Sequence, residues 1–528
     1  MAPQPRKGQI GGSRAHSALA FIVCRRSRRK RSNDLIDTQG VLELPSLLHA
    51  TLTDLSTAVS DRQVSSTALT TAYLTRIAEV NNYFRAVIET NPDALSIAGA
   101  LDEEQRTRGR RSPLHGIPVL LKDTIFTGDK MEATAGSTVL LGARPAHEAR
   151  LVTRLRDGGA LILSKANKSE WGTFRATAGA SAWSARGGLS MGAYCKDMRP
   201  SGSSSGSTVA IALGLTAACI GGETDGSIIW PASRAGIVGI KPTLGLVSTD
   251  GDSRSRRNDD TYASACSGGT DLTGLRIGLP SSSLLQNNDA PLLHAFEDPL
   301  GLLHSHGGAT IIRDANFACQ GEYNQQDKLS KGAQRALRAG CFQNDIKHHL
   351  DNLAVNPHSI KDIDDIIRLT ETDRREEYPR RGIDLFELAS SVDTAGPEFH
   401  AALKQNARFA GEGSIPGTLR THRLDLIAAP AMFGATGSLA CRSGLPVVTV
   451  PLGKHPKGST PTTRWNSGGP DKVVDIAPGV PFGIIFTGGA RTERTLLRVA
   501  YAFEQMTRVR EMLVVYNPPK IDLSDVLA

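Results

Sequence analysis

Short apolar runs alternate with helical patterns along most of this chain, and that alternation constrains the fold more than any other feature. The runs are bounded by Gly, Pro or polar turns, as expected of strands in a buried sheet. They occupy residues 119–121, 161–163, 237–240, 426–430 and 446–451. Helical spacing dominates residues 44–110, 209–218 and 490–508, whereas residues 248–269 and 453–478 are expected to be irregular. Alternating helices and strands predict an α/β fold, a large mixed sheet covered on both faces by helices.

Composition describes an ordinary globular protein and excludes a membrane span. Hydrophobic residues make up 40% and charged residues 22% of the 528 residues. The longest apolar runs are far shorter than the roughly 18 residues that a spanning helix needs. The seven cysteines are scattered, with no metal-binding spacing, and this fits a reducing compartment. We therefore predict a cytoplasmic protein, and the cysteines indicate no metal site.

The basic charge of the chain is concentrated at its N-terminus. Residues 1–33 hold nine Lys and Arg and no acid, so the rest of the chain has a net charge of −1 out of a total of +8. We predict a basic disordered tail over 1–33, or a misplaced start codon, followed by one domain over 34–528. The run from Arg25 to Arg31 is alternatively a nuclear import signal or a polyanion-binding arm. Because residues 34–528 are close to electrically neutral, we expect them to bind no nucleic acid.

Three stretches together contain the groups needed for acyl transfer by a serine nucleophile whose base is a lysine and not a histidine. Lys122 ends an apolar run, Ser203 lies in a serine- and glycine-rich loop, and Ser227 follows Gly226 in a glycine turn. A lysine at the end of a buried strand loses hydration, which lowers its pKa and lets it act as a base. Backbone N–H groups at a glycine turn can converge on an oxyanion.

Each stretch also has a structural interpretation. Lys122 alone could simply pair with its neighbour Asp123. The serine run could be a flexible linker. It also resembles a phosphate-binding loop, but the lysine of that motif is missing. A linker rarely leads directly into an apolar helix such as residues 209–218, so a rigid serine-lined turn fits better.

Taken together, these motifs resemble the amidase signature family, most closely its fungal and bacterial general amidases. The matching motifs are residues 116–123 (GIPVLLKD), 202–207 (GSSSGS), 223–228 (ETDGSI), 231–233 (PAS) and 239–243 (GIKPT). The resemblance extends from about Leu44 to Pro518 and implies the amidase signature fold. It implies an amidase that hydrolyses a carboxamide C–N bond to a carboxylate and ammonia or an amine.

The resemblance also implies the roles of the site residues. Lys122 would be the neutral base, Ser203 the relay serine preceded by a cis peptide bond, and Ser227 the nucleophile that forms the acyl-enzyme. The backbone N–H groups of Thr224, Asp225, Gly226 and Ser227 would hold the oxyanion. Ser203 and Ser227 are 24 residues apart, which is the family's spacing. The implied mechanism needs neither a metal nor an organic cofactor. A small amide substrate and a possible homodimer are the implied partners.

The chain departs from the family in ways that keep two alternatives open. Ile229 stands where many relatives have Arg, Gly222 where many have Thr, and a deletion is expected near residues 249–270. The deleted segment packs near the active site in relatives, so one alternative is an inactive pseudoenzyme. The other is the glutaminase-type A subunit of an aminoacyl-tRNA amidotransferase, which would require partner subunits.

Overall fold

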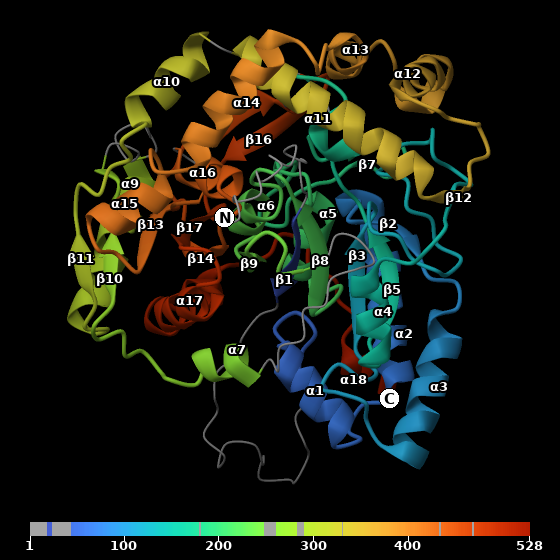
Figure 1. Cartoon of the computed structure of the whole chain (residues 1–528). Helices are drawn as coiled ribbons and strands as arrows, with labels where there is room; N and C mark the ends of the chain where they lie inside the picture. Colours follow the sequence, from blue (N-terminus) through green and yellow to red (C-terminus); the bar gives the residue numbers. More distant parts are fainter. Residues whose placement is uncertain are drawn as a thin grey trace, which may run out of the picture.

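The computed structural model describes residues 18–23, 44–178, 181–247, 260–281, 290–329, 331–431, 435–466 and 469–527. A mixed sheet of eleven strands runs through the centre of this part of the chain (Figure 1). In spatial order its strands are β11 (Thr310–Ile312), β10 (Arg276–Gly278), β13 (Leu426–Pro430), β17 (Pro481–Gly488), β14 (Val447–Lys454), β9 (Val238–Lys241), β1 (Ala18–Val23), β8 (Ala218–Glu223), β3 (Pro118–Lys122), β5 (Leu161–Ala166) and β2 (Val87–Thr90). The three pairs of short strands outside this sheet are β4 (Arg144–Pro145) with β12 (Leu353–Val355), β6 (Trp183–Ser184) with β7 (Gly188–Leu189), and β15 (Thr462–Trp465) with β16 (Lys472–Ile476).

Helices cover the sheet on both faces, and α10 to α14 form a cap at one end of it, called the helical cap below. They are α1 (Leu52–Ser60), α2 (Ser66–Phe84), α3 (Ala94–Arg108), α4 (Arg150–Asp157), α5 (Ser205–Ala212), α6 (Ile229–Arg234), α7 (Asp260–Ala265), α9 (Ala290–Ser305), α10 (Gln320–Leu329), α11 (Lys331–Asp351), α12 (Ile363–Thr372), α13 (Asp384–Ser391), α14 (Pro397–Ala410), α15 (Ile415–Thr421), α16 (Thr436–Arg442), α17 (Glu493–Thr507) and α18 (Leu523–Leu527). Helices α10 to α14 lie at the top of Figure 1. No described helix combines the length and apolar character needed to cross a bilayer.

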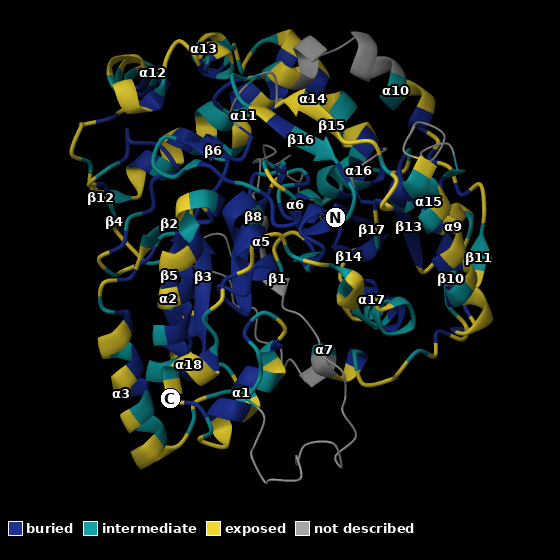
Figure 2. Cartoon of the chain, turned by 180° about the vertical axis from the view of Figure 1, so that it is seen from behind, coloured by how far each residue is buried: buried dark blue, intermediate teal, exposed yellow. Residues whose placement is uncertain are grey.

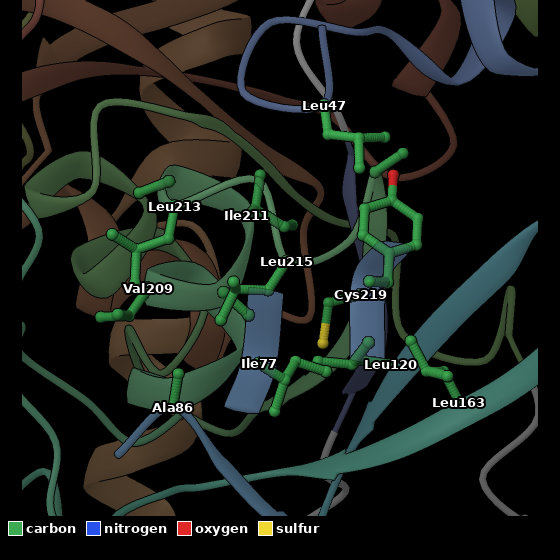
Figure 3. Close-up of a cluster of buried hydrophobic side chains, with 14 of the residues drawn as sticks. Leu47, Ile77, Ala86, Leu120, Leu163, Val209, Ile211, Leu213, Leu215 and Cys219 are labelled. Atoms are coloured by element: carbon green, nitrogen blue, oxygen red, sulfur yellow. The ribbon is translucent and has the colours of Figure 1, made fainter. Parts of the chain in front are cut away.

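The side chains of β3 alternate between two apolar clusters, which shows why both faces of the main sheet must be covered. Leu120 contributes to the large core that includes residues of α2 and α5 (Figure 3), whereas Val119 and Leu121 point into a second cluster, with α4. Successive side chains of a strand face opposite sides, so an apolar run needs a layer on each side. Figure 2 shows the central strands as buried and the outer faces of α3 and α12 as largely exposed. The predicted α/β fold, with its mixed sheet between two helical layers, is confirmed.

Four expectations about individual segments are wrong. Helix α7, Asp260–Ala265, lies in the region expected to be irregular over 248–269. The helix expected over 209–218 is α5, which starts earlier and ends at Ala212, and Ala218 already belongs to β8. The region expected to be a loop over 453–478 contains the hairpin of β15 and β16. Six residues of the expected disordered tail, Ala18–Val23, form β1, because this uncharged run ends in Phe, Ile and Val, which favour strands. The expected deletion falls partly on residues 248–259, which lie outside the described residues.

Candidate active site

Lys122 is held at the end of β3, where it is 3% exposed. Its Nζ lies 2.7 Å from Ser203 Oγ and donates a hydrogen bond of 2.8 Å to the carbonyl oxygen of Gly222. Strands β3 and β8 are parallel, so Lys122 and Gly222 reach the same edge of the sheet. Burial, followed by repulsion from Lys168, holds the pKa of Lys122 well below its ordinary value of 10.5. The lowered pKa favours the neutral amine, the form that can accept a proton.

The serine-rich loop packs tightly against the strands before α5. The Gly202–Ser203 peptide bond is cis, as the resemblance implied. Ser203 is buried, and its carbonyl oxygen accepts a hydrogen bond of 3.0 Å from the Ser169 N–H. A Cβ at Gly206 would approach the Ala86 carbonyl oxygen to 2.2 Å, so the loop can lie this close to the chain only with glycine there. The loop is thus a rigid, buried turn and not a linker.

The second serine lies on the turn between β8 and α6. Gly226 has a φ of +76°, and a Cβ there would come within 2.3 Å of the Trp230 ring. The Ser204 N–H donates to the Ser227 carbonyl oxygen at 3.0 Å, so the serine loop and this turn are directly joined. Ser227 is half-buried, which leaves it open to a substrate. Within the described residues, no hydrogen bond joins Ser203 Oγ and Ser227 Oγ.

Glu223 fixes the far side of the same turn. Its buried carboxylate accepts hydrogen bonds from the N–H groups of Ile228, at 2.6 Å, and Ile229, at 2.9 Å. By contrast, the N–H groups of Asp225, Gly226 and Ser227 donate to no other described residue. Free N–H groups at a glycine turn are what a developing oxyanion requires. Glu223 is part of the motif at residues 223–228, but the sequence alone did not indicate its role in holding the turn.

Asp225 is tied to two elements outside the turn. Its Oδ2 lies 3.2 Å from Nη2 of Arg338 in α11, and it accepts a hydrogen bond of 3.0 Å from Ser438 Oγ in α16. Ile229, where many relatives have Arg, is buried in an apolar cluster beneath the turn. The guanidinium that meets Asp225 therefore comes from the helical cap, a contact that local sequence patterns do not reveal.

Asp123 does not pair with Lys122. Its carboxylate accepts hydrogen bonds from Thr134 Oγ1 and the Gly136 N–H, both at 2.8 Å, and lies 3.6 Å from the Arg186 guanidinium. Burial raises the pKa of Asp123. The interpretation of Lys122 as the ion-pair partner of its neighbour is therefore wrong.

Two further buried lysines lie near the end of β5, Lys165 within the strand and Lys168 just after it, and sequence reasoning missed both. Lys165 donates to the carbonyl oxygen of Ile125 at 2.5 Å, and Lys168 raises the electrostatic cost of charging Lys122. Burial lowers the pKa of each to about 8. Their signal in the sequence is two lysines close together directly after the apolar run 161–163, where a buried sheet leaves little water for them.

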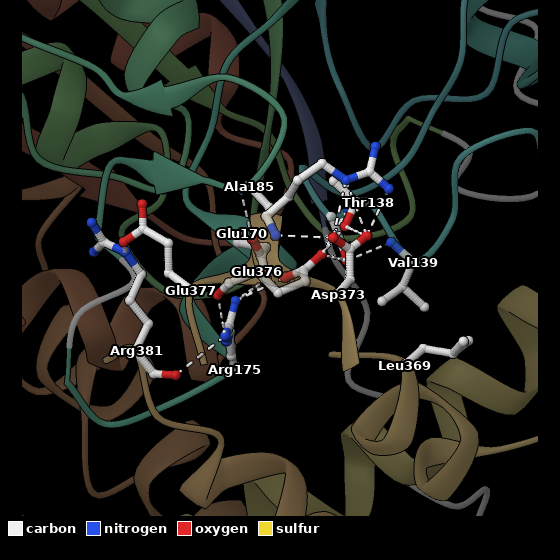
Figure 4. A network of polar contacts seen from close by, with 12 residues as sticks. Thr138, Val139, Glu170, Arg175, Ala185, Leu369, Asp373, Glu376, Glu377 and Arg381 are labelled. Atoms are coloured by element: carbon white, nitrogen blue, oxygen red, sulfur yellow. Dashed lines mark hydrogen bonds and ion pairs between the residues drawn. The ribbon is translucent and has the colours of Figure 1, made fainter. Parts of the chain in front are cut away.

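A buried ion cluster joins this region to the helical cap (Figure 4). Nη1 of Arg175 lies 2.9 Å from Oε1 of Glu170 and 2.8 Å from Oε2 of Glu376, and all three side chains are almost fully buried. Glu376 also accepts hydrogen bonds from Ser137 Oγ and the Thr138 N–H, both at 2.7 Å. Burial, followed by the nearby Glu376 carboxylate, raises the pKa of Glu170 well above 4.5. The cap is therefore anchored by charges as well as by apolar packing.

The sequence and the fold can now be compared with known proteins. The amidase family model matches residues 68–261. A protein of Arthroderma benhamiae named "Putative amidase" is 34% identical, and the match covers 93% of this chain and 87% of the relative. The Arabidopsis thaliana protein named "Probable amidase At4g34880" is 31% identical, with 90% of this chain and 92% of the relative covered. The A subunit of Glutamyl-tRNA(Gln) amidotransferase from Chloroflexus aurantiacus is 36% identical, over 39% of this chain and 42% of the relative.

Solved structures agree with these matches. The native peptide amidase of Stenotrophomonas maltophilia superposes with a TM-score of 0.73 at 33% identity, covering 89% of this chain and 98% of that one. An amidase family protein of Bacillus anthracis, at 24% identity and a TM-score of 0.72, shares the fold. The chain belongs to the amidase family, whose members are the amidase signature enzymes. It is an amidase, a hydrolase that acts on amide C–N bonds, and the predicted family, fold and enzyme class are confirmed.

Proposed function

We propose that Lys122, Ser203 and Ser227 form the catalytic triad of this amidase and that its substrate is a small carboxamide. The observation that carries the proposal is the 2.7 Å contact between Lys122 Nζ and Ser203 Oγ, with both groups buried. A buried neutral amine next to a serine hydroxyl is a base in contact with a proton donor. The direct bond from Ser204 to Ser227 supports Ser203 as the link between base and nucleophile.

In the proposed mechanism, Lys122 accepts the hydroxyl proton of Ser203 as Ser203 accepts that of Ser227. Ser227 Oγ attacks the amide carbonyl carbon and forms a tetrahedral intermediate. Its oxyanion is stabilised by N–H groups of residues 224–227. The proton then returns through Ser203 to the leaving nitrogen, the C–N bond breaks, and ammonia or an amine departs. Water next attacks the acyl-ester by the same route in reverse and releases the carboxylate.

The similarity to a peptide amidase over nearly its whole length supports a peptide amide as the first substrate to test. The amidotransferase alternative has less support, because the A subunits from Chloroflexus aurantiacus and Chloroflexus aggregans match 39% and 51% of this chain, whereas the amidase of Arthroderma benhamiae matches 93% of it. Cytoplasmic location, the homodimer and the role of the basic run from Arg25 to Arg31 as a targeting signal remain predictions from the sequence.

Intact-mass analysis after labelling with a fluorophosphonate tests the proposal without knowledge of the substrate. The wild type should gain one adduct, Ser227→Ala should gain none, and Lys122→Ala should label far more slowly. Ser205→Ala is the matched control, because Ser205 begins α5 two residues after Ser203 and its buried Oγ makes no hydrogen bond to a described residue. Circular dichroism establishes that each variant is folded. A folded wild type without an adduct would refute the proposal and favour the pseudoenzyme.

A further inference from the structure

Strand β1 lies in the middle of the main sheet, although it comes from the N-terminal end of the chain (Figure 1). It pairs antiparallel with β8 from Ala18 opposite Glu223 to Val23 opposite Ala218. On its other side, Ile22 and Val23 pair with β9. Strands β8 and β9 do not pair with each other in the described part of the chain. Six residues therefore connect one half of the sheet, β2 to β8, to the other half, β9 to β11.

No nearer segment takes this place. Between the end of β9 at Lys241 and the start of β10 at Arg276, the only regular element among the described residues is helix α7. Without β1, strands β8 and β9 would each have an open edge at the centre of the protein. Buried N–H and C=O groups without partners are costly, so this position in the sheet requires a strand.

The register brings β1 alongside the groups of the active site. Leu19 is opposite Gly222, whose carbonyl oxygen accepts the hydrogen bond from Lys122. Ala18 is opposite Glu223, whose carboxylate holds the turn that carries Ser227. The pairing with β1 thus continues along β8 to the residue that directly precedes the nucleophile turn. A displacement of β8 would move the Gly222 acceptor and the Ser227 turn relative to Lys122, which lies on β3.

We propose that residues 18–23 are a positioning segment of the active site, which closes the sheet beside β8 and holds Gly222 and Glu223 in place for Lys122 and Ser227. The catalytic part of this inference rests on the proposed function, whereas the placement of the strand does not. The segment is then a required part of the enzyme and not a tail.

Cross-linking tests the placement independently of activity. Ile22 is directly opposite Cys219, a free and buried cysteine. Opposed residues in an antiparallel pair have Cα atoms about 4.5–5.5 Å apart, within the range that a disulfide spans. In a Cys24→Ser background, Ile22→Cys treated with diamide should form a disulfide with Cys219, with diamide taking up the two electrons and two protons. Peptide mass mapping identifies the bond.

Phe21→Cys in the same background is the matched control, because neighbouring residues of a strand face opposite sides of the sheet. It should not cross-link to Cys219. Absence of the disulfide in Ile22→Cys, or equal cross-linking in both variants, would overturn the placement of β1.

Two truncations test the positioning role. A chain lacking residues 1–17 keeps β1 and should label with a fluorophosphonate at the wild-type rate. A chain lacking residues 1–24 should label roughly 100-fold more slowly, since small displacements of reacting groups cost about that factor. Equal labelling of both chains would refute the role. If the full chain is not labelled, the proposed function fails while the cross-link still decides where β1 lies.

A backbone variant covers the case in which the shorter chain does not fold. Ile22→Pro in the full chain removes one N–H from a strand that is paired on both sides, and proline is disfavoured there. We expect a folded protein that is labelled more slowly by the fluorophosphonate. The midpoint of the labelling rate against pH should move toward the pKa of an ordinary lysine, because water would reach the edge of β8 beside Lys122. An unchanged rate and midpoint would contradict the role.

Discussion

Lys122 Nζ and Ser203 Oγ lie 2.7 Å apart at the buried edge of the sheet, and the Gly222 carbonyl oxygen is the second partner of the amine. The lysine ends β3 and the glycine lies in the parallel strand β8. The pair therefore depends on the alignment of two adjacent strands, while the serine is supplied by a loop between them in sequence. Base and relay are positioned by the core of the fold.

The pH dependence of turnover should report the pKa of Lys122. The base acts in its deprotonated form, so kcat/KM should rise with pH through that pKa and then level off. Burial holds this pKa well below 10.5, and the midpoint should therefore lie well below 10.5. Lys122→Arg should be inactive over the whole range, because a guanidinium stays protonated. Lys130→Met is the control, since that lysine is largely exposed, and a wild-type midpoint near 10.5 would contradict the assignment.

Ser203→Ala should lower kcat by about 10²–10⁴-fold, which is the usual contribution of a positioned proton-transfer group. The fold should persist, because the contact of Ser203 with Ser169 is made by the backbone. Steady-state kinetics with a peptide amide measures kcat and KM separately, and KM should change much less than kcat. Ser205→Ala should resemble the wild type, and an unchanged kcat in Ser203→Ala would remove the relay from the mechanism.

Glu223→Ala should destabilise the protein and slow acylation. The change leaves the N–H groups of Ile228 and Ile229 without their acceptor, and a hydrogen bond to a charged group contributes about 1.5–3 kcal/mol. Urea unfolding measures the loss, and fluorophosphonate labelling reports whether the Ser227 turn has moved. Glu103→Ala removes an exposed ion pair and should change neither quantity. Wild-type stability in Glu223→Ala would show that the turn does not need this carboxylate.

The sequence predicted the parts of the fold and site that depend on local pattern. The apolar run before Lys122 indicated a buried strand, and β3 is buried along its whole length. Gly226 indicated a sharp turn, and its φ of +76° is one that glycine adopts readily. The order and spacing of the motifs, through their resemblance to the amidase signature family, predicted the roles of Lys122, Ser203 and Ser227.

What the sequence did not predict depends on contacts between distant segments. Arg338 meets Asp225 although 113 residues separate them, and Glu376 meets Arg175 across 201 residues. No periodicity encodes such pairs, because each is set by how the cap docks on the sheet. The strand Ala18–Val23 was missed because a basic run follows it, and the charge of the surroundings outweighed a short apolar pattern.

Glu170 should make stability fall as pH rises. Its folded-state pKa is raised well above 4.5, first by burial and then by Glu376. The folded protein therefore holds this proton more tightly than the unfolded chain does. The resulting stabilisation is complete below about pH 4.5 and is lost as pH rises through the folded-state pKa.

Glu170→Gln isolates this effect, because glutamine stays neutral and keeps an oxygen that can accept from Arg175. The difference in the free energy of unfolding, wild type minus variant, should decrease as pH rises above about 4.5 and level off above the folded-state pKa, as chemical denaturation at each pH would show. Glu103→Gln, whose partner is the exposed Arg106, should give no such decrease. If the difference in the free energy of unfolding for Glu170→Gln does not change with pH, the carboxyl group is ionised in the folded protein throughout. Arg175 would then neutralise the charges of both Glu170 and Glu376.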